Sequence, residues 1–467
     1  MTDHPSGAGN DASSHATAAD APPSGAPIDT AATPTGETLI PRRTGFTRVL
    51  AWGSWDWGSA AFNAVATTFV FTVYLTGKSF GDPDNLSAQL GLAITIAGLV
   101  VLLLAPVLGQ RTDTSGRRKL WLGVNTAVVV ICLALMFFVQ ASPGFALFGM
   151  GLVAVGTVFF EIASVNYNGM LRQVSTSKNI GKVSGLGWGM GYVGGIALLL
   201  IVYFGFIHPD VGWFGVTSAN GLAVRVSMLI AALWFAVFAL PVLFAVPENK
   251  ALETVGRPKV SFFRSYAVLG RDIARLWKTS RQTVYFLIAS AIFRDGLTGV
   301  FTFGGVLAAG TFGFTAGEVI IFAIAANVVA GISTIAVGAL DDRLGAKPVI
   351  LTSLIGLVIS AVAVFVLHAN GQIVFWTLGL ALCLFVGPAQ SASRTFLGRL
   401  IPPGREGEIY GLYATTGRAA TFIAPAMFTL FITIGGKQYW GILGIALVLF
   451  VGLLLLIPVR AKQRQLD

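Results

Sequence analysis

Long apolar runs, separated by short polar segments, occupy residues 47–459. Each run is long enough to cross a hydrocarbon core of about 30 Å as an α-helix, which takes about 20 residues. Two uncharged regions are too long for one span, and turn-forming residues break them at 141–144 and 368–371. The pattern predicts an all-α membrane protein with twelve transmembrane helices, at residues 47–76, 86–110, 119–140, 144–170, 183–207, 222–246, 282–310, 317–340, 347–368, 371–395, 408–434 and 438–459.

One polar loop occurs twice, each time after the second span of its half. It has a glycine, an aspartate four positions on, a second glycine three further on and a base two beyond that. The equivalent residues are Gly109 and Gly338, Asp113 and Asp342, Gly116 and Gly345, and Arg118 and Lys347, with Arg117 and Arg343 as further bases. We expect the first glycine to let helices approach closely, the aspartate to cap a helix end, and the second glycine to form a left-handed turn. The repeat predicts two pseudo-symmetric six-helix bundles.

The basic residues predict the orientation of the spans. Most of the 31 Lys and Arg residues fall in loops on one side, and Arg394 is counted among them, whereas Lys78 and Lys437 fall on the other side. Cytoplasmic loops carry the excess of bases, so we expect a multi-pass protein of the cell membrane with both termini in the cytoplasm. The predicted parts are a disordered tail at 1–43, bundles at 44–246 and 282–460, a basic cytoplasmic linker at 247–281 with an amphipathic helix near 262–276 on the inner leaflet, and a tail at 461–467.

Composition excludes several classes of function. The hydrophobic share is 55% and the charged share 11%, and the net charge of +10 comes from short loops, which argues against nucleic-acid binding. Cys132 and Cys383 lie within apolar runs and are expected to be core residues, and the four histidines have no ligand spacing. No phosphate-binding loop or catalytic cluster is present in the sequence, so we expect neither an enzyme nor a bound metal or cofactor.

Polar residues inside the predicted spans are the candidate site, because buried charges are costly and mark solute pathways. They are Asp56, Glu161, Arg294, Asp295 and Arg418, with the amides of Asn63, Asn166, Asn168 and Gln390. A buried acid could carry a proton, and an arginine could hold a substrate carboxylate. The alternative is structural, with Arg294 or Arg418 paired to Asp56 or Glu161 and the amides bonding neighbouring helices. Arg225 and Glu318, near helix ends, are expected to snorkel or cap.

The repeated loop resembles the signature loop of the major facilitator superfamily of transporters. Four further stretches carry a closer resemblance: 55–69 around Asp56, 185–195, 293–305 around Arg294, and 387–413 around Gln390. In these stretches the chain is similar to the UMF1 branch of that superfamily, which includes the Atg22-like vacuolar amino-acid effluxers. In the second stretch the closely spaced glycines Gly185, Gly189, Gly191 and Gly195, together with Gly181 just before it, predict tight helix packing.

The resemblance implies a central cavity lined by helices 1, 4, 7 and 10, which would hold most of the charged sites. It also implies secondary transport of a small organic solute by alternating access, with amino acids as the leading candidate and protons as a candidate coupling ion. The alternatives are a transporter of a sugar or a lipophilic drug-like solute, and a membrane sensor or scaffold that transports nothing. The expected partners are the solute, protons and the lipid bilayer, with the chain acting as a monomer.

Overall fold

The computed structural model describes residues 45–115, 117–175, 180–246, 262–400 and 406–460. The predicted tails at 1–43 and 461–467 and most of the predicted linker lie outside these residues. The described residues are almost entirely helical, and they form no strand beyond an isolated bridge between Val211 and Thr217.

The N-terminal half of the bundle runs from α1 to α8. Its first span is α1 (Phe46–Ala60), the π-helical segment η1 (Ala61–Phe69) and the short helix α2 (Phe71–Leu75). The following elements are α3 (Pro83–Ser115), α4 (Arg118–Leu135), α5 (Ala146–Gly169), α6 (Leu171–Val174), α7 (Ile180–Val202) with η4 (Tyr203–Ile207), and α8 (Leu222–Ala245).

The C-terminal half of the bundle runs from α10 to α17, and the amphipathic helix α9 (Phe262–Thr279) precedes it. Its elements are α10 (Arg281–Gly310), α11 (Ala316–Leu344), α12 (Ala346–Val366), α13 (Gln372–Val374) with η8 (Phe375–Gly379) and α14 (Leu380–Leu400), α15 (Glu406–Ala419), α16 (Ile423–Gly435) and α17 (Trp440–Leu456).

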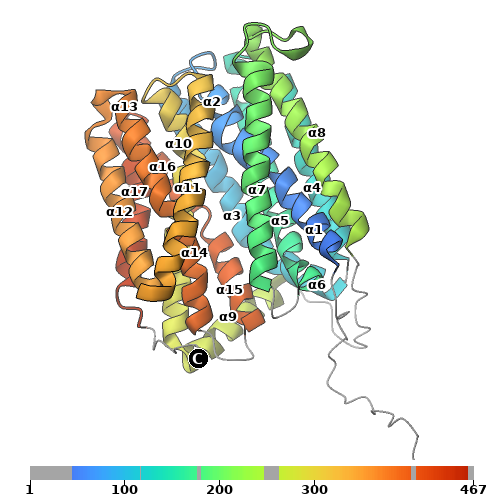
Figure 1. The fold of residues 1–467 in the computed structure, drawn as a ribbon, viewed down its shortest axis with the longest axis vertical. Helices are drawn as coiled ribbons and strands as arrows, with labels where there is room; N and C mark the ends of the chain where they lie inside the picture. The colour runs from blue at the N-terminus through green and yellow to red at the C-terminus, as the bar shows by residue number, and fades with distance from the viewer. Residues whose placement is uncertain (1–44, 116, 176–179, 247–261, 401–405, 461–467) are drawn as a thin grey trace, which may run out of the picture. The chain divides into compact units, whose positions relative to one another are not determined.

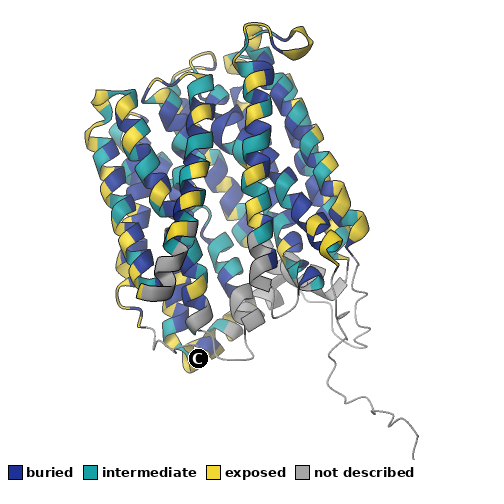
Figure 2. Cartoon of the chain, viewed as in Figure 1, coloured by how far each residue is buried: buried dark blue, intermediate teal, exposed yellow. Residues whose placement is uncertain are grey.

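These helices confirm the predicted fold. Eleven of them are long and apolar enough to cross a membrane, and the twelfth predicted span is the shorter apolar helix Trp440–Leu456. Many large apolar side chains are exposed along the bundle, including Leu147 and Phe244 at 80% each. Figure 2 shows such exposed positions along the outer helices. A bilayer would cover this surface, which a soluble monomer rarely exposes.

The two halves pack together along several helix pairs. Helix α3 contacts α15 and α16, α10 contacts η1 and α2, and α7 contacts α11. Figure 1 shows α7 and α11 next to each other where the halves meet, and α9 at one end of the bundle. Helix α9 packs on α3 and α10. We call this end the linker end and the opposite end, where α2 finishes and α3 begins, the far end.

Glycines set the close approach of α7 to α1. A Cβ atom at Gly194 would lie 2.6 Å from the backbone oxygen of Trp57, and one at Gly187 would lie 3.0 Å from the carboxylate of Asp56. A Cβ at Gly195 would meet Ala60 at an ordinary 3.5 Å, whereas Gly189 has open space around it. The tight contacts thus fall on Gly187 and Gly194, which the predicted spacing did not include. Of the predicted glycines, Gly191 and Gly195 would make only ordinary contacts of 3.5 Å and Gly189 none, and the surroundings of Gly181 and Gly185 lie outside the described residues.

Candidate functional site

The two halves present opposite charges to each other at the centre of the bundle. The N-terminal half contributes the carboxylates of Asp56 on α1 and Glu161 on α5. The C-terminal half contributes the guanidinium groups of Arg394 on α14 and Arg418 on α15. Glu161 pairs directly with Arg418, and Arg394 acts electrostatically on Asp56. The arrangement can hold a solute that carries both charges.

Glu161 and Arg418 form an ion pair between the halves. The Arg418 Nη1 atom lies 3.5 Å from Glu161 Oε2 and also donates to the backbone oxygen of Glu161. The side chain of Arg418 is 14% exposed and that of Glu161 is 26% exposed, so the pair is not fully buried. The structural alternative, an ion pair of Arg418 with an acid, thus describes this conformation.

Asp56 is held in an aromatic setting. Its Oδ2 atom accepts a hydrogen bond of 3.0 Å from the hydroxyl of Tyr167. The ring of Tyr167 stacks on Trp52 and Trp55, with centroids 4.5 and 4.4 Å away. Trp55 in turn donates to Thr126 on α4 at 3.0 Å. These contacts fix the direction of the carboxylate, which a flexible side chain would otherwise lose.

Arg394 is a site residue that the sequence interpretation missed. Counting loop charges placed it in a cytoplasmic loop, but it lies within α14, and its guanidinium sits 4.7 Å over the ring of Trp188 on α7. It therefore reaches from one half to the other. Its spacing of four from Gln390 was the available signal, because residues four apart share one face of a helix.

Arg294 and Asp295 are adjacent on α10 but have different surroundings. Arg294 lies 4.0 Å over the ring of Tyr413 and donates 3.2 Å to the Tyr413 backbone oxygen, both within its own half. Asp295 is 4% exposed, and its Oδ2 atom accepts the backbone N–H of Ala424 at 2.5 Å. This geometry favours a structural role for Asp295 over the predicted place on a solute or proton pathway.

The predicted amides have mixed environments. Asn63 is exposed, and η1 around it packs on helices of both halves. Asn168 is exposed and donates 2.8 Å to Ser164 on its own helix, and Gln390 is half-buried on α14. Asn166 is buried and donates to Ile162, while its side-chain oxygen has no partner among the described atoms.

The predicted gating loops are described in part. Gly116 lies outside the described residues, as do the side chains of Asp113, Asp342 and Arg343 and the surroundings of Gly109 and Gly338. Gly345 before α12 has φ of +88° and ψ of 155°, a positive-φ conformation that glycine adopts readily but not the left-handed helical one expected for the second copy. Arg117 is exposed at the start of α4, and Arg118 donates to the backbone oxygen of Gly169.

In each half, a lysine at the start of the third span donates hydrogen bonds to carbonyl oxygens just after the sixth span. Lys119 donates 2.8 Å to the oxygen of Val246 just after α8, and Lys347 donates 2.8 and 2.7 Å to the oxygens of Ile457 and Val459 just after α17. The structural equivalent of Lys347 is therefore Lys119, one position beyond the Arg118 that the loop pattern suggested. A cation there satisfies carbonyls at a helix C-terminus.

Near the far end, Arg225 and Glu318 bond to helix ends as expected. Arg225 donates 2.5 Å to the oxygen of Phe137. Glu318 accepts the backbone N–H of Thr315 at 2.8 Å and its own N–H donates to the Thr315 hydroxyl at 3.3 Å, which forms a capping box at the start of α11.

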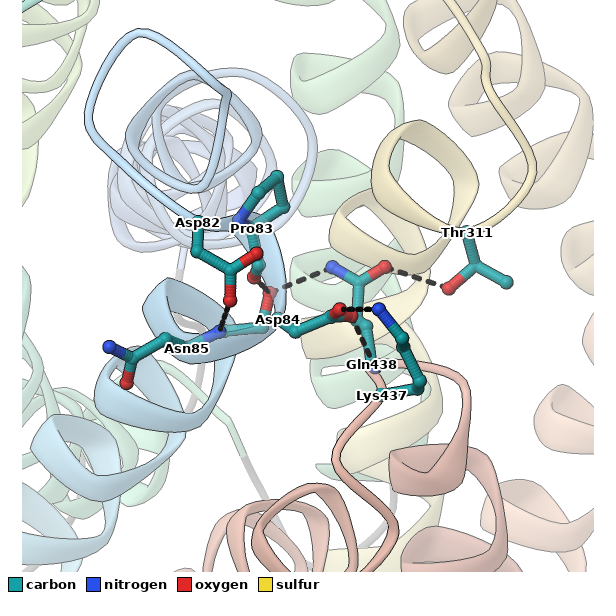
Figure 3. Close-up of polar contacts among 8 residues, drawn as sticks. Asp82, Pro83, Asp84, Asn85, Thr311, Lys437 and Gln438 are labelled. Carbon is teal, nitrogen blue, oxygen red and sulfur yellow. Dashed lines mark hydrogen bonds and ion pairs between the residues drawn. The ribbon is translucent and has the colours of Figure 1, made fainter.

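Polar contacts join the two halves at the far end (Figure 3). Asp84 at the start of α3 accepts Lys437 Nζ at 3.0 Å and the backbone N–H of Gln438 at 2.6 Å. The side chain of Gln438 donates 2.7 Å to Ser87 and accepts 2.7 Å from Thr311 on α10. We call these five residues the far-end network. It ties α3 to α10 and to the turn between α16 and α17.

Solved structures place this bundle among known transporters. A mutant of the nucleoside transporter NupG matches with a TM-score of 0.61 at 15% identity, over 88% of this chain and 98% of that chain. The xylose transporter XylE from E. coli, in an inward open conformation, matches equally well at 0.61 and 15%, over 87% and 95%. At this identity the likeness shows the fold alone, a helical bundle of the kind that these two transporters have.

Sequence relatives narrow the class to one family. Residues 170–467 match the family described as "Vacuole effluxer Atg22 like", and the chain belongs to this family of membrane transporters. The MFS-type transporter YxiO of Bacillus subtilis is 23% identical over 409 residues, covering 87% of this chain and 93% of YxiO. Autophagy-related protein 22 of Cryptococcus neoformans is 24% identical over 286 residues, and the match spans only 51% of that fungal protein.

Proposed function

We propose that this membrane transporter moves a small zwitterionic solute, with amino acids as the leading candidates, between its two halves by alternating access. The observation that carries the proposal is the opposition of charges at the centre: carboxylates from one half and guanidiniums from the other. A carboxylate of the solute would meet Arg394 or Arg418, and its ammonium would meet Asp56 or Glu161. Such a solute would join the halves when it binds, which is what an occluded intermediate requires.

The far-end network supports a conformation closed at that end. Three elements from the two halves meet there through Asp84, Lys437 and Gln438. The excess of loop bases supports placing the linker end in the cytoplasm of the cell that makes the protein. Together they support the inference that this conformation is inward-facing, so that the solute would exchange with the cytoplasm.

An apolar pocket supports a second candidate, a lipophilic solute. It lies mainly in the C-terminal half, between α10, α11, α12, η8, α14 and α17, and its lining includes Phe301, Phe322, Phe375 and Leu382, with Phe69 from η1. A zwitterion could place an apolar side chain in this pocket. A lipophilic cation would use the pocket alone, and the guanidiniums nearby would disfavour it.

Proton coupling would require an acid between the two halves that can gain and lose a proton. Asp56 and Glu161 are the acids available to a proton between the halves, because Asp295 is engaged by backbone amides. In the conformation described, Glu161 is neutralised by Arg418, so Asp56 is the better candidate. Its protonation would weaken its attraction to Arg394 across the interface.

Ligand-induced thermal stabilisation of the purified protein tests the solute class. The panel is amino acids, sugars and lipophilic cations, measured on wild type, Arg394→Gln, Asp56→Asn and the control Arg225→Gln. Arg225 is also an arginine of a span, but it bonds to Phe137 near the far end. We expect amino acids to stabilise wild type and Arg225→Gln at similar concentrations. The two site variants should need an amino-acid concentration at least about tenfold higher for the same stabilisation.

Counterflow in proteoliposomes then tests transport of the solute that binds. Stabilisation by sugars or lipophilic cations, with none by amino acids, would overturn the zwitterion assignment. Binding without counterflow would favour the sensor or scaffold alternative over a transporter of that solute.

A further inference from the structure

The eleventh span is interrupted at the level of the central charges. Helix α15 ends at Ala419 and α16 begins at Ile423. Between them the backbone makes shorter-range bonds, from Ile423 N–H to Ala420 oxygen at 3.0 Å and from Thr421 N–H to Arg418 oxygen at 3.3 Å. Pro425 explains the interruption, since a proline lacks the N–H of a regular helix and its ring clashes with the carbonyl four residues before it.

Asp295 caps the new helix start that this interruption creates. Its buried carboxylate accepts the N–H of Ala424, and the N–H of Ile423 also acts on it. Gly299, one turn further along α10, makes room for this contact, because a Cβ there would lie 2.9 Å from the Cβ of Ala424. A carboxylate at a helix N-terminus gains from the free N–H groups and from the helix dipole.

The neighbouring residue holds the other side of the interruption. Arg294 binds the Tyr413 oxygen and ring on α15, and Gly417 makes room for it, because a Cβ there would lie 2.7 Å from Arg294 Nη1. Two consecutive residues of α10 therefore hold the two pieces of one span. Arg418 lies in the last turn of α15, between these two attachments, and from there reaches Glu161 in the other half.

We propose that Asp295 is a positioning residue: by capping α16 it fixes the interruption and thereby directs Arg418 at Glu161 across the interface. Loss of the cap would leave the buried N–H of Ala424 without its acceptor and would remove the negative charge at the start of α16, so the backbone of the interruption would rearrange. Arg418, two residues from the turn, would then change direction. The inference deepens the proposed transport site, but it makes its own prediction about the resting protein.

The test is a thermal-stability double-mutant cycle on the full chain without solute. Glu161→Gln is introduced into wild type, Asp295→Ala, Asp295→Asn and the control Ser290→Ala, a buried polar residue of α10 that bonds within its own helix to Leu287. We expect Glu161→Gln to lower Tm in wild type and Ser290→Ala. In Asp295→Ala the same change should lower Tm by about half as much or less, because the two sites are coupled.

In Asp295→Asn the side-chain amide oxygen can still accept the hydrogen bond, but the negative charge is lost. The loss of Tm on adding Glu161→Gln should therefore lie between the losses in wild type and in Asp295→Ala. Hydrogen exchange at the backbone amides of residues 423, 424 and 426 should accelerate in Asp295→Ala and less in Asp295→Asn. If Asp295→Ala does not fold, the effect of Glu161→Gln on the Tm of Asp295→Asn tests the proposal by itself. Equal effects of Glu161→Gln in all backgrounds, or no effect in wild type, would overturn the proposal. The cycle is measured without solute, so its result does not depend on whether the proposed solute is correct.

Discussion

Asp84 and Lys437 form an ion pair of 3.0 Å that joins the start of α3 to the turn between α16 and α17. The two residues belong to opposite halves and lie 353 positions apart in the sequence. Lys437 keeps 63% of its side-chain exposure, whereas Asp84 keeps 23% and also accepts the N–H of Gln438. We therefore expect Asp84 to contribute more than Lys437 to holding the two halves together at the far end, mainly through its hydrogen bond from the Gln438 backbone N–H.

We predict that Asp84→Ala opens the far end more than Lys437→Ala does. The reporter is Ala308→Cys, a buried α10 position, in a chain whose Cys132 and Cys383 are replaced by serine. Asp84→Ala removes a charge-assisted bond to a part-buried N–H, and the labelling rate by a polar thiol reagent should rise about tenfold. Lys437→Ala removes an exposed pair, so its effect should be small. Equal rates in all three proteins would show that the network does not close this end.

The pair also predicts a pH dependence. The hydrogen bond to Asp84 and its negative charge raise the pKa of Lys437 above its ordinary value of 10.5. A raised lysine pKa contributes stability that is fully present below the unfolded pKa and is lost as pH rises through the folded pKa. The Tm difference between wild type and Lys437→Met should be constant from neutral pH to 10.5 and should shrink above it. A difference that already changes near neutral pH would assign the effect to another group.

The repeated lysines predict matched effects in the two halves. Lys347 donates to two carbonyls after α17, whereas Lys119 donates to one after α8. Lys347→Met should therefore lower the stability by about 1 kcal/mol or somewhat more, and Lys119→Met by less. Melting of the purified protein measures this, with Lys278→Met on the exposed face of α9 as the control. A larger loss for Lys119→Met would contradict the ranking.

Sequence predicted the helices well because their signals are local. The apolar runs, the breaks at 141–144 and 368–371, and the helix near 262–276 each depend on neighbouring residues, and the observed elements begin and end within a few residues of them. The positions of the charges within the spans were equally visible. Their partners were not, since a partner such as Arg418 for Glu161 is fixed by how two bundles dock.

Two residues show where the sequence interpretation ends. Arg394 was counted as a loop base because it lies near the end of an apolar run. In the structure α14 continues past it, and its guanidinium lies over the ring of Trp188 in the other half. Asp295 was predicted on a pathway because a charge within a span is costly. The N–H groups that offset that cost arise from Pro425 on a different helix, and no local pattern connects the two.

The final prediction separates the two roles of Tyr167 toward Asp56. Its hydroxyl bonds the carboxylate at 3.0 Å, and its ring stacks between Trp52 and Trp55. Tyr167→Phe keeps the stacked ring and removes only the bond, so the protein should keep its Tm within about 2 °C. If Asp56 binds the ammonium of the solute, Tyr167→Phe should weaken amino-acid binding about three- to tenfold, because the carboxylate loses its fixed direction, whereas Asp56→Asn should weaken it by at least about tenfold. The measurement is the amino-acid concentration that gives half-maximal thermal stabilisation, with Tyr203→Phe as a control that removes a hydroxyl bonded to His208 near the far end. Unchanged binding by Tyr167→Phe together with loss by Asp56→Asn would leave Asp56 in the site but remove Tyr167 as its positioning residue, and unchanged binding by both would remove Asp56 as well.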